Sequence, residues 1–266
     1  MERLSSNSTR SSRPIILGLA GVLFFLLVWQ LIPALGILNP AYFPNATDTL
    51  AQLAKDLGTG ALWKDIGYTL IAWGLGLAMA TIGAIIFGTV IGLVPFLRRA
   101  THTTIEFLRP IPSVALIPVA ILVYGLRLEA ALLIIVYASF WQVFVQVLYG
   151  VADVDSVARD TARSFGLSRS QRFRSLVFPT ALPYLITGVR LAAAVALILT
   201  ITAQMFIGVP GIGRSIIFAQ QGANWVQVYA LIVVTGILGL LVNIGFRAIE
   251  RRVLHWHESV RGEELL

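Results

Sequence analysis

The charged stretch from residue 153 to residue 178 holds the side chains that are best suited to binding another molecule. It contains Asp153, Asp155, Asp160 and five arginines, and it lies between two long apolar segments. Such a stretch fits two roles: a basic loop that is solvated on an anionic membrane surface, or a folded element that docks onto another protein. The charge alone leaves both roles open.

Helix punctuation within this stretch favours the docking role. Asp155 or Ser156 can cap a short helix over residues 157–165, and Gly166 can end it. Residues 168–171 have the pattern of a capping box, which would begin a second helix with an apolar side. The stretch is therefore predicted to fold as a helix–turn–helix.

The rest of the chain offers no recognisable catalytic chemistry. A phosphate-binding P-loop needs a lysine, and the only lysines are Lys55 and Lys64, neither of which belongs to such a motif. The absence of cysteine excludes thiolate metal sites and cysteine catalysis. His255 and His257 could supply only two metal ligands. We therefore predict no catalytic, cofactor-binding or metal-binding residue, and any ATP and Mg²⁺ would be bound by a partner.

A few polar side chains within apolar segments are candidates for a solute pathway. Gln142 and Gln146 are one helical turn apart, so they share a helix face. Such amides could instead form interhelical hydrogen bonds, which are common in membranes. Arg190 lies about 16 Å along a helix from Pro179, where it could snorkel, pair with an acid or act as a gate.

The composition places these residues in a membrane. Of 266 residues, 57% are hydrophobic and only 12% are charged, and the mean hydropathy is +0.83. A water-soluble globule needs more polar surface, and disordered chains and coiled coils need more charge. The net charge of +7 could indicate nucleic-acid binding, but arginines at the cytoplasmic ends of spans explain it better. We expect a lipid bilayer as partner and no nucleic acid.

The gaps between charged residues predict six membrane-spanning helices, because a span needs about 20 apolar residues. The expected spans are about 15–34, about 66–94, Arg109 to Arg127, Glu129 to Asp153, Pro179 to Pro210 and about 225–248. The first could also be a signal peptide, but its length favours an uncleaved span. The third is the shortest, and Pro118 would kink it.

Small residues in the second span predict close contact with another helix. Gly88 and Gly92 form a G-x-x-x-G pattern, and Gly76, Ala80 and Ala84 lie in the same span. Small side chains let helix backbones approach closely in lipid. The second span should therefore pack against protein.

The distribution of basic residues predicts that both termini are cytoplasmic. With the N-terminus inside, only Lys55, Lys64, Arg127 and Arg214 fall outside. The basic residues on the cytoplasmic side are then Arg3, Arg10, Arg13, Arg98, Arg99, Arg109, Arg159, Arg163, Arg169, Arg172, Arg174, Arg247, Arg251, Arg252 and Arg261. The expected organisation is a cytoplasmic tail over 1–14, a transmembrane domain over 15–250 that includes the loop 153–178, and a cytoplasmic tail over 251–266.

The charged stretch also resembles a known motif. Asp160-Thr161-Ala162, followed by Gly166 and by residues 176–179, is similar to the EAA loop, E-A-A-x3-G-x9-I-x-L-P, of the membrane subunits of ABC importers. Residues 109–118 (RPIPSVALIP) and 182–192 (LPYLITGVRLA) resemble the nitrate/sulfonate/taurine/bicarbonate branch of these permeases. Residues 40–44 and 208–213 resemble two outer segments of that branch, so the resemblance covers nearly the whole chain.

This resemblance implies an all-α polytopic membrane protein with the type I ABC importer permease fold, in a bacterial inner membrane. In that family the loop is a coupling helix that rests in a groove of a cytoplasmic ATPase, a role that falls here on Asp160, Thr161, Ala162 and Gly166. Asp160 should lie in the first turn of its helix, where the helix dipole favours an acid. The implied partners are two ATPase subunits, a second permease copy and an extracytoplasmic solute-binding protein. The expected function is alternating-access import of a small anion or small organic solute.

Three positions depart from the family pattern. Asp160 replaces Glu and Thr161 replaces Ala, which keeps the charge of the motif but shortens its reach. Gln204 stands where this branch often has Glu, and we count it as a third candidate for lining the pathway. An ion-coupled secondary transporter is the alternative function, although such carriers usually place an acid inside the bilayer, where we expect none here.

Overall fold

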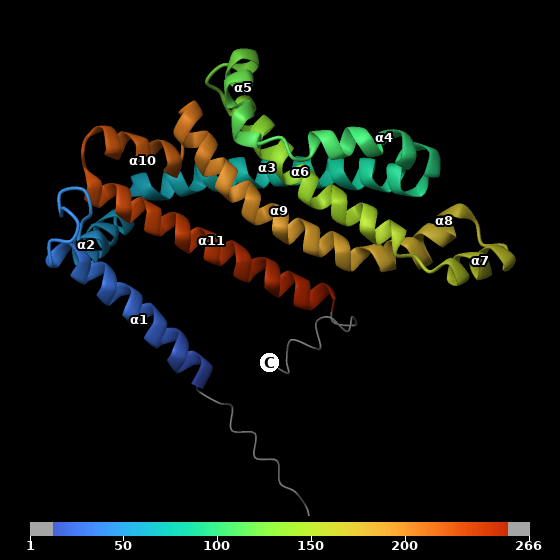
Figure 1. The fold of residues 1–266 in the computed structure, drawn as a ribbon, viewed down its shortest axis with the longest axis horizontal. Coiled ribbons are helices and arrows are strands. Elements are labelled where there is room, and N and C mark those ends of the chain that lie inside the picture. Colours follow the sequence, from blue (N-terminus) through green and yellow to red (C-terminus); the bar gives the residue numbers. More distant parts are fainter. Residues whose placement is uncertain (1–12, 255–266) are drawn as a thin grey trace, which may run out of the picture.

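A computed structural model describes residues 13–254, and these residues are helical with short connections (Figure 1). Five helices are long and apolar enough to cross a membrane. They are α1 (Arg13–Ala34), α3 (Gly60–Leu93), α6 (Leu128–Ala152), α9 (Phe178–Ile207) and α11 (Trp225–Val253). Between α3 and α6, α4 (Pro95–Leu108) is followed after a bend of 84° by η1 (Ser113–Leu116) and α5 (Ile117–Tyr124), and this bent pair has the composition of a broken span or of a re-entrant loop. Five of the six predicted spans are thus present, and the sixth is reached only if this bent pair is counted as one span.

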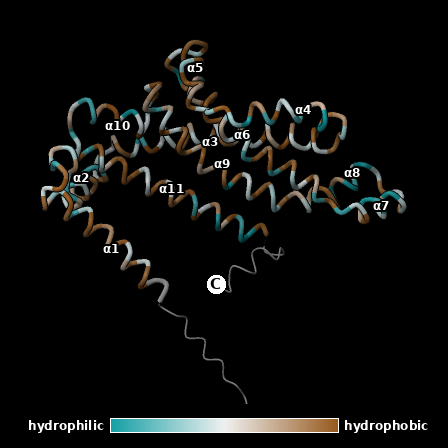
Figure 2. The backbone as a smooth tube through the Cα atoms, viewed as in Figure 1, coloured by the Kyte–Doolittle hydropathy of each residue, from teal (hydrophilic) through white to brown (hydrophobic). Residues whose placement is uncertain are grey.

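Short helices gather at the two ends of this bundle (Figure 1). At one end lie α2 (Ala46–Leu57) and α10 (Ile212–Gln221). At the other end lie α7 (Ser156–Ser164) and α8 (Arg169–Arg172), and the π-helical turn η2 (Phe173–Val177) leads from α8 into α9. Figure 2 shows hydrophilic residues along α7 and α8 and predominantly hydrophobic ones along α1 and α3. The charged stretch therefore lies beyond the end of the apolar bundle.

The third span differs from the sequence-based expectation of a helix between Arg109 and Arg127. Residues 95–108 form α4, which folds back along α3, and α5 is only 8 residues long. Prolines explain both breaks. Val94 is extended because it precedes Pro95, which begins α4, and Pro110 and Pro112 interrupt the chain after α4.

The centre of the bundle is α6, which packs between α3 and α9. Gly88 of α3 lies against Val147, and a methyl group added to Gly88 would come within 2.8 Å of the Val147 side chain. Gly188 of α9 lies against Gln146 in the same way, at 2.9 Å. The prediction that the small residues of the second span pack against protein is confirmed.

Helix α1 contacts the bundle only near its C-terminal end. The indole N–H of Trp29 donates a hydrogen bond to the Pro44 carbonyl at 3.1 Å, and its ring lies 6.2 Å from the ring of Tyr229. Large apolar side chains farther back, such as Leu17 and Phe24, are exposed. In water such an exposed apolar surface would promote aggregation, so it fits contact with lipid or with another membrane helix.

Candidate coupling surface and solute pathway

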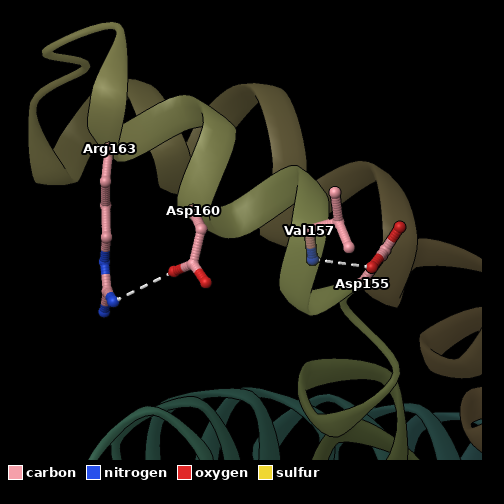
Figure 3. Close-up of polar contacts among 4 residues, drawn as sticks. All are labelled: Asp155, Val157, Asp160 and Arg163. Atoms are coloured by element: carbon pink, nitrogen blue, oxygen red, sulfur yellow. Dashed lines mark hydrogen bonds and ion pairs between the residues drawn. The ribbon is translucent and has the colours of Figure 1, made fainter.

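The first helix of the charged stretch is held by its own side chains. The Asp155 carboxylate accepts a hydrogen bond from the Val157 N–H at 2.8 Å (Figure 3). Of the two predicted caps, Asp155 is the one that is used. The helix ends at Gly166, whose φ of +73° is a left-handed conformation that glycine adopts without strain.

The second helix begins with the predicted capping box. The Ser168 hydroxyl accepts a hydrogen bond from the Gln171 N–H at 3.3 Å, and the Gln171 side chain accepts one from the Ser168 N–H at 2.8 Å. These bonds satisfy backbone donors that a helix start leaves open. The predicted helix–turn–helix is thus confirmed.

The residues assigned to coupling lie together on α7 and at its end. Asp160, Thr161 and Gly166 are exposed, and Ala162 is half-buried. Asp160 lies in the middle of the helix and not in its first turn, so the expected dipole interaction is replaced by an ion pair with Arg163 at 3.3 Å (Figure 3). Because both partners are exposed, this pair contributes little to stability, and Asp160 can exchange it for a partner at low cost.

One side of α7 also carries apolar residues that the sequence analysis did not single out. Val157 is 70% exposed and Phe165, the residue that follows α7, is 79% exposed. With Thr161 they are spaced four residues apart, so we group Val157, Thr161 and Phe165 as the outer face of α7. Their regular spacing within an otherwise polar segment was the signal available in the sequence.

The two glutamines of α6 occupy different surroundings. Gln142 is exposed, whereas Gln146 lines a hollow of about 580 Å³ between α6 and α9. Thr180, Tyr184 and Thr187 contribute further polar atoms to this hollow. A partly polar hollow between two apolar spans can hydrate a small polar solute, which supports the predicted pathway role of Gln146. Gln142 does not line this hollow, and its pathway role stays a prediction.

Gln204 lies in a different environment, because it is fully buried at the opposite end of α9. Its side-chain oxygen accepts hydrogen bonds from the Thr69 hydroxyl and from the Gly213 N–H, both at 3.1 Å. Its NH₂ group donates to the Pro210 carbonyl at 3.3 Å, which a glutamate could not do. These contacts hold the 208–213 turn against α3 and α9 and give Gln204 a packing role, while its pathway role stays a prediction.

Arg190 forms an ion pair with an acid, which is one of the three alternatives that the sequence left open. Its guanidinium lies 2.7 Å from the carboxylate of Glu250 on α11, and both side chains are partly buried. The pair lies beside a largely apolar hollow of about 260 Å³ between α9 and α11, which Asn243 and Phe246 also line. Pairing is confirmed, and a gate role for Arg190 stays a prediction.

Arg109 lies at the bend between α4 and α5. Arg109 follows the last residue of α4 and is exposed. The Tyr137 hydroxyl of α6 donates a hydrogen bond to the Leu108 carbonyl at 2.6 Å and so fixes this end of α4. The sequence placed Arg109 at the inner end of an unbroken span, whereas the structure places it where α4 ends.

The structure describes no gathering of metal ligands. Within residues 13–254, no group of three or more histidine or acidic side chains is close enough to hold a metal ion. His255 and His257 lie outside the described residues.

A bundle of apolar helices with a capped polar helix–turn–helix at one end defines a polytopic membrane protein. Residues 80–255 match the family described as the binding-protein-dependent transport system inner membrane component, and the chain belongs to this family. It is therefore a permease of the ABC transporter class, with the predicted all-α fold of multiple membrane-spanning helices.

Several characterised permeases are similar along most of the chain. The taurine transport system permease protein TauC of Escherichia coli is 29% identical over 255 residues, which cover 94% of this chain and 93% of that protein. The bicarbonate transport system permease protein CmpB of Synechocystis is 28% identical, with 88% and 86% covered. The nitrate import permease protein NrtB of Leptolyngbya laminosa is 28% identical, with 80% and 73% covered.

Solved structures share the fold at lower identity. A chain of the MetNI methionine ABC transporter, in inward-facing conformations, superposes with a TM-score of 0.62 at 18% identity, covering 73% of this chain and 96% of that one. A chain of an amino acid ABC transporter superposes with the same TM-score at 16% identity, covering 75% and 97%. These likenesses support the fold and carry no information on the solute.

Proposed function

We propose that this chain forms the solute pathway of an ATP-driven, binding-protein-dependent importer in a bacterial inner membrane. The observation that carries the proposal is the match of residues 80–255, which include the folded stretch 153–178, to the inner membrane component family. The names of the similar permeases support a small anion or small organic solute, since they transport taurine, bicarbonate and nitrate. The chain itself is not an enzyme in this proposal.

The proposed partners occupy the two ends of the bundle. A cytoplasmic ATPase, which binds ATP and Mg²⁺, receives the outer face of α7 and Asp160. A second copy of the permease supplies a second α7, so that two ATPase subunits each receive one. A solute-binding protein delivers the solute at the opposite end, where α2 and α10 lie. The excess of arginines around α4, α7 and α8 supports a cytoplasmic location for that end and for both termini.

The mechanism that we propose is alternating access driven through α7. From Arg169 the chain continues through α8, η2 and α9 to Ile207 with no loop between the helical segments. A displacement of the α7–α8 end would therefore act directly on α9, which forms one wall of the hollow beside Gln146. Closure of the ATPase dimer would bring two such ends together and open the pathway outward.

The test is solute uptake into proteoliposomes that contain the permease with its ATPase. Uptake is expected only with internal ATP, the ATPase and the solute-binding protein together, and taurine, bicarbonate and nitrate are the first solutes to try. An ATPase variant that lacks the P-loop lysine is the matched control and should abolish uptake. Uptake driven by a proton or sodium gradient in the absence of ATP would instead establish the ion-coupled alternative.

A further inference from the structure

A basic pocket lies between the α7–α8 helices and the elbow that joins α3 to α4. Its volume is about 500 Å³. Four arginines line it, two from α7 and two from α8: Arg159, Arg163, Arg169 and Arg172. The rest of its wall is apolar and comes from the elbow, η2 and the end of α3: Leu93, Val94, Pro95, Phe173, Leu176 and Val177. Nothing in the proposed transport mechanism uses these arginines.

The positive charge of this basic pocket is largely uncompensated. Arg163 is paired with Asp160, which leaves three arginines that form no ion pair within residues 13–254. The Nε–H of Arg172 is buried and has no hydrogen-bond acceptor there. Guanidinium groups gathered in this way repel one another, and an unpaired buried N–H costs free energy. A phosphate group would compensate the charge, because its oxygens accept the forked N–H groups of arginine.

The apolar half of the pocket shows which kind of phosphate fits. Leu93 ends the long apolar helix α3 and Val94 follows it, so the pocket lies at the end of a helix that is apolar enough to cross a membrane. Both residues are exposed, and the neighbouring Phe96 is 75% exposed. A free anion gains no favourable contact from such an apolar surface, whereas a phospholipid can place its acyl chains along it. We propose that the basic pocket binds the phosphate headgroup of an anionic phospholipid.

The opposite sides of α7 would then serve two different partners. Arg159 and Arg163 face the pocket, whereas Val157 and Phe165 of the outer face do not line it and are exposed. A bound lipid would brace the α7–α8 helices against the α3–α4 elbow and leave the outer face free. Lipid binding would therefore stiffen this end of the bundle without blocking an ATPase.

The test compares variants of the full permease–ATPase complex in nanodiscs of phosphatidylcholine that contain increasing phosphatidylglycerol. Retained phosphatidylglycerol is counted by native mass spectrometry, and both leaflets carry the same lipids, so the result does not depend on orientation. Arg169→Gln with Arg172→Gln should weaken phosphatidylglycerol binding about fivefold for each arginine, or about 25-fold together. Arg174→Gln is the matched control, because Arg174 is exposed on the same segment and does not line the pocket.

A second double variant, which keeps the charge of both side chains, separates a loss of lipid binding from a loss of folding. Arg169→Lys with Arg172→Lys retains the charge and should bind phosphatidylglycerol better than the glutamine variant. An equal loss for Arg174→Gln would overturn the proposal, because it would indicate a diffuse surface effect. Inorganic phosphate that stabilises the complex in detergent as much as phosphatidylglycerol does would also overturn it. Loss of the ATPase from the glutamine variant, with unchanged lipid binding, would assign the pocket to an acidic protein partner instead.

Discussion

The α7–α8 helices and the buried site around Gln204, at opposite ends of the bundle, satisfy their polar groups in opposite ways. At the α7–α8 end, hydrogen bonds join residues two or three positions apart, such as Asp155 with Val157, and the side chains are exposed. At the other end, Gln204 is fully buried and bonds Thr69, which is 135 positions away. Exposed local bonds can exchange partners at little cost, whereas buried long-range bonds cannot. The comparison indicates a surface at α7–α8 that can receive and release a partner and a buried site around Gln204 that cannot.

The comparison would fail most clearly if the buried end tolerated an apolar substitution. Gln204→Leu would leave two groups without their partner, the Gly213 N–H and the Pro210 carbonyl. The Thr69 hydroxyl would still donate to the Asp65 carbonyl and accept from the Ile212 N–H. We expect a loss of about 2–6 kcal/mol in stability, because each buried unsatisfied group costs about 1–3 kcal/mol. Thermal unfolding of the purified protein in detergent measures this loss. Gln142→Leu, at an exposed position, should change stability little, and similar effects of the two variants would contradict the assignment.

The exposed end should respond to a backbone change with a loss of coupling. Gly166→Val places a β-branched residue at a φ of +73°, which costs about 1–3 kcal/mol locally. No other atom lies within 4 Å of an added Cβ, so the backbone is the only source of strain within the described residues. The variant should insert normally but lose solute-stimulated ATP hydrolysis. Gly166→Asn, which tolerates this conformation better, should retain more activity; a Gly166→Val complex with normal hydrolysis would refute the coupling role.

Breaking the ion pair between α9 and α11 should cost an amount of stability between the losses expected at the two ends. Arg190→Gln leaves Glu250 without its ion pair at a partly buried site, and we expect a loss of about 1–2 kcal/mol. The double variant with Glu250→Gln should recover part of this loss, since no charge is left unpaired. A double-mutant cycle on thermal unfolding measures the coupling. If Arg190 is also a gate, the double variant should be stable yet transport abnormally.

The smallest effect on stability is expected at the exposed ion pair of α7. Asp160→Arg replaces an exposed carboxylate, so the free energy of unfolding should change by less than about 1 kcal/mol. Co-purification of the ATPase should nevertheless fall, because the surface offered to it reverses its charge. Asp160→Glu is the matched control and should retain the ATPase. Normal ATPase recovery with Asp160→Arg would remove Asp160 from the coupling surface.

The candidate site was predictable where its signals are short-range. Asp155, Gly166 and the Ser168 capping box were predicted because a cap depends on residues within one helical turn. Gln146 could be named from the sequence because a polar residue in an apolar helix is visible there, and its pathway role stays a prediction. The packing role of Gln204 was not predictable, because its partners come from α3 and from the turn beyond α9.

The sequence by itself determined five of the membrane-spanning segments, the helix ends of the charged stretch and the resemblance that led to the family. These properties depend on runs of apolar residues and on contacts within a few positions. Only the tertiary structure decided that the third span is broken, that Arg190 pairs with Glu250, and that four arginines surround one pocket. Each of these depends on which helices lie side by side, and the packing of small residues such as Gly88 against α6 sets that arrangement.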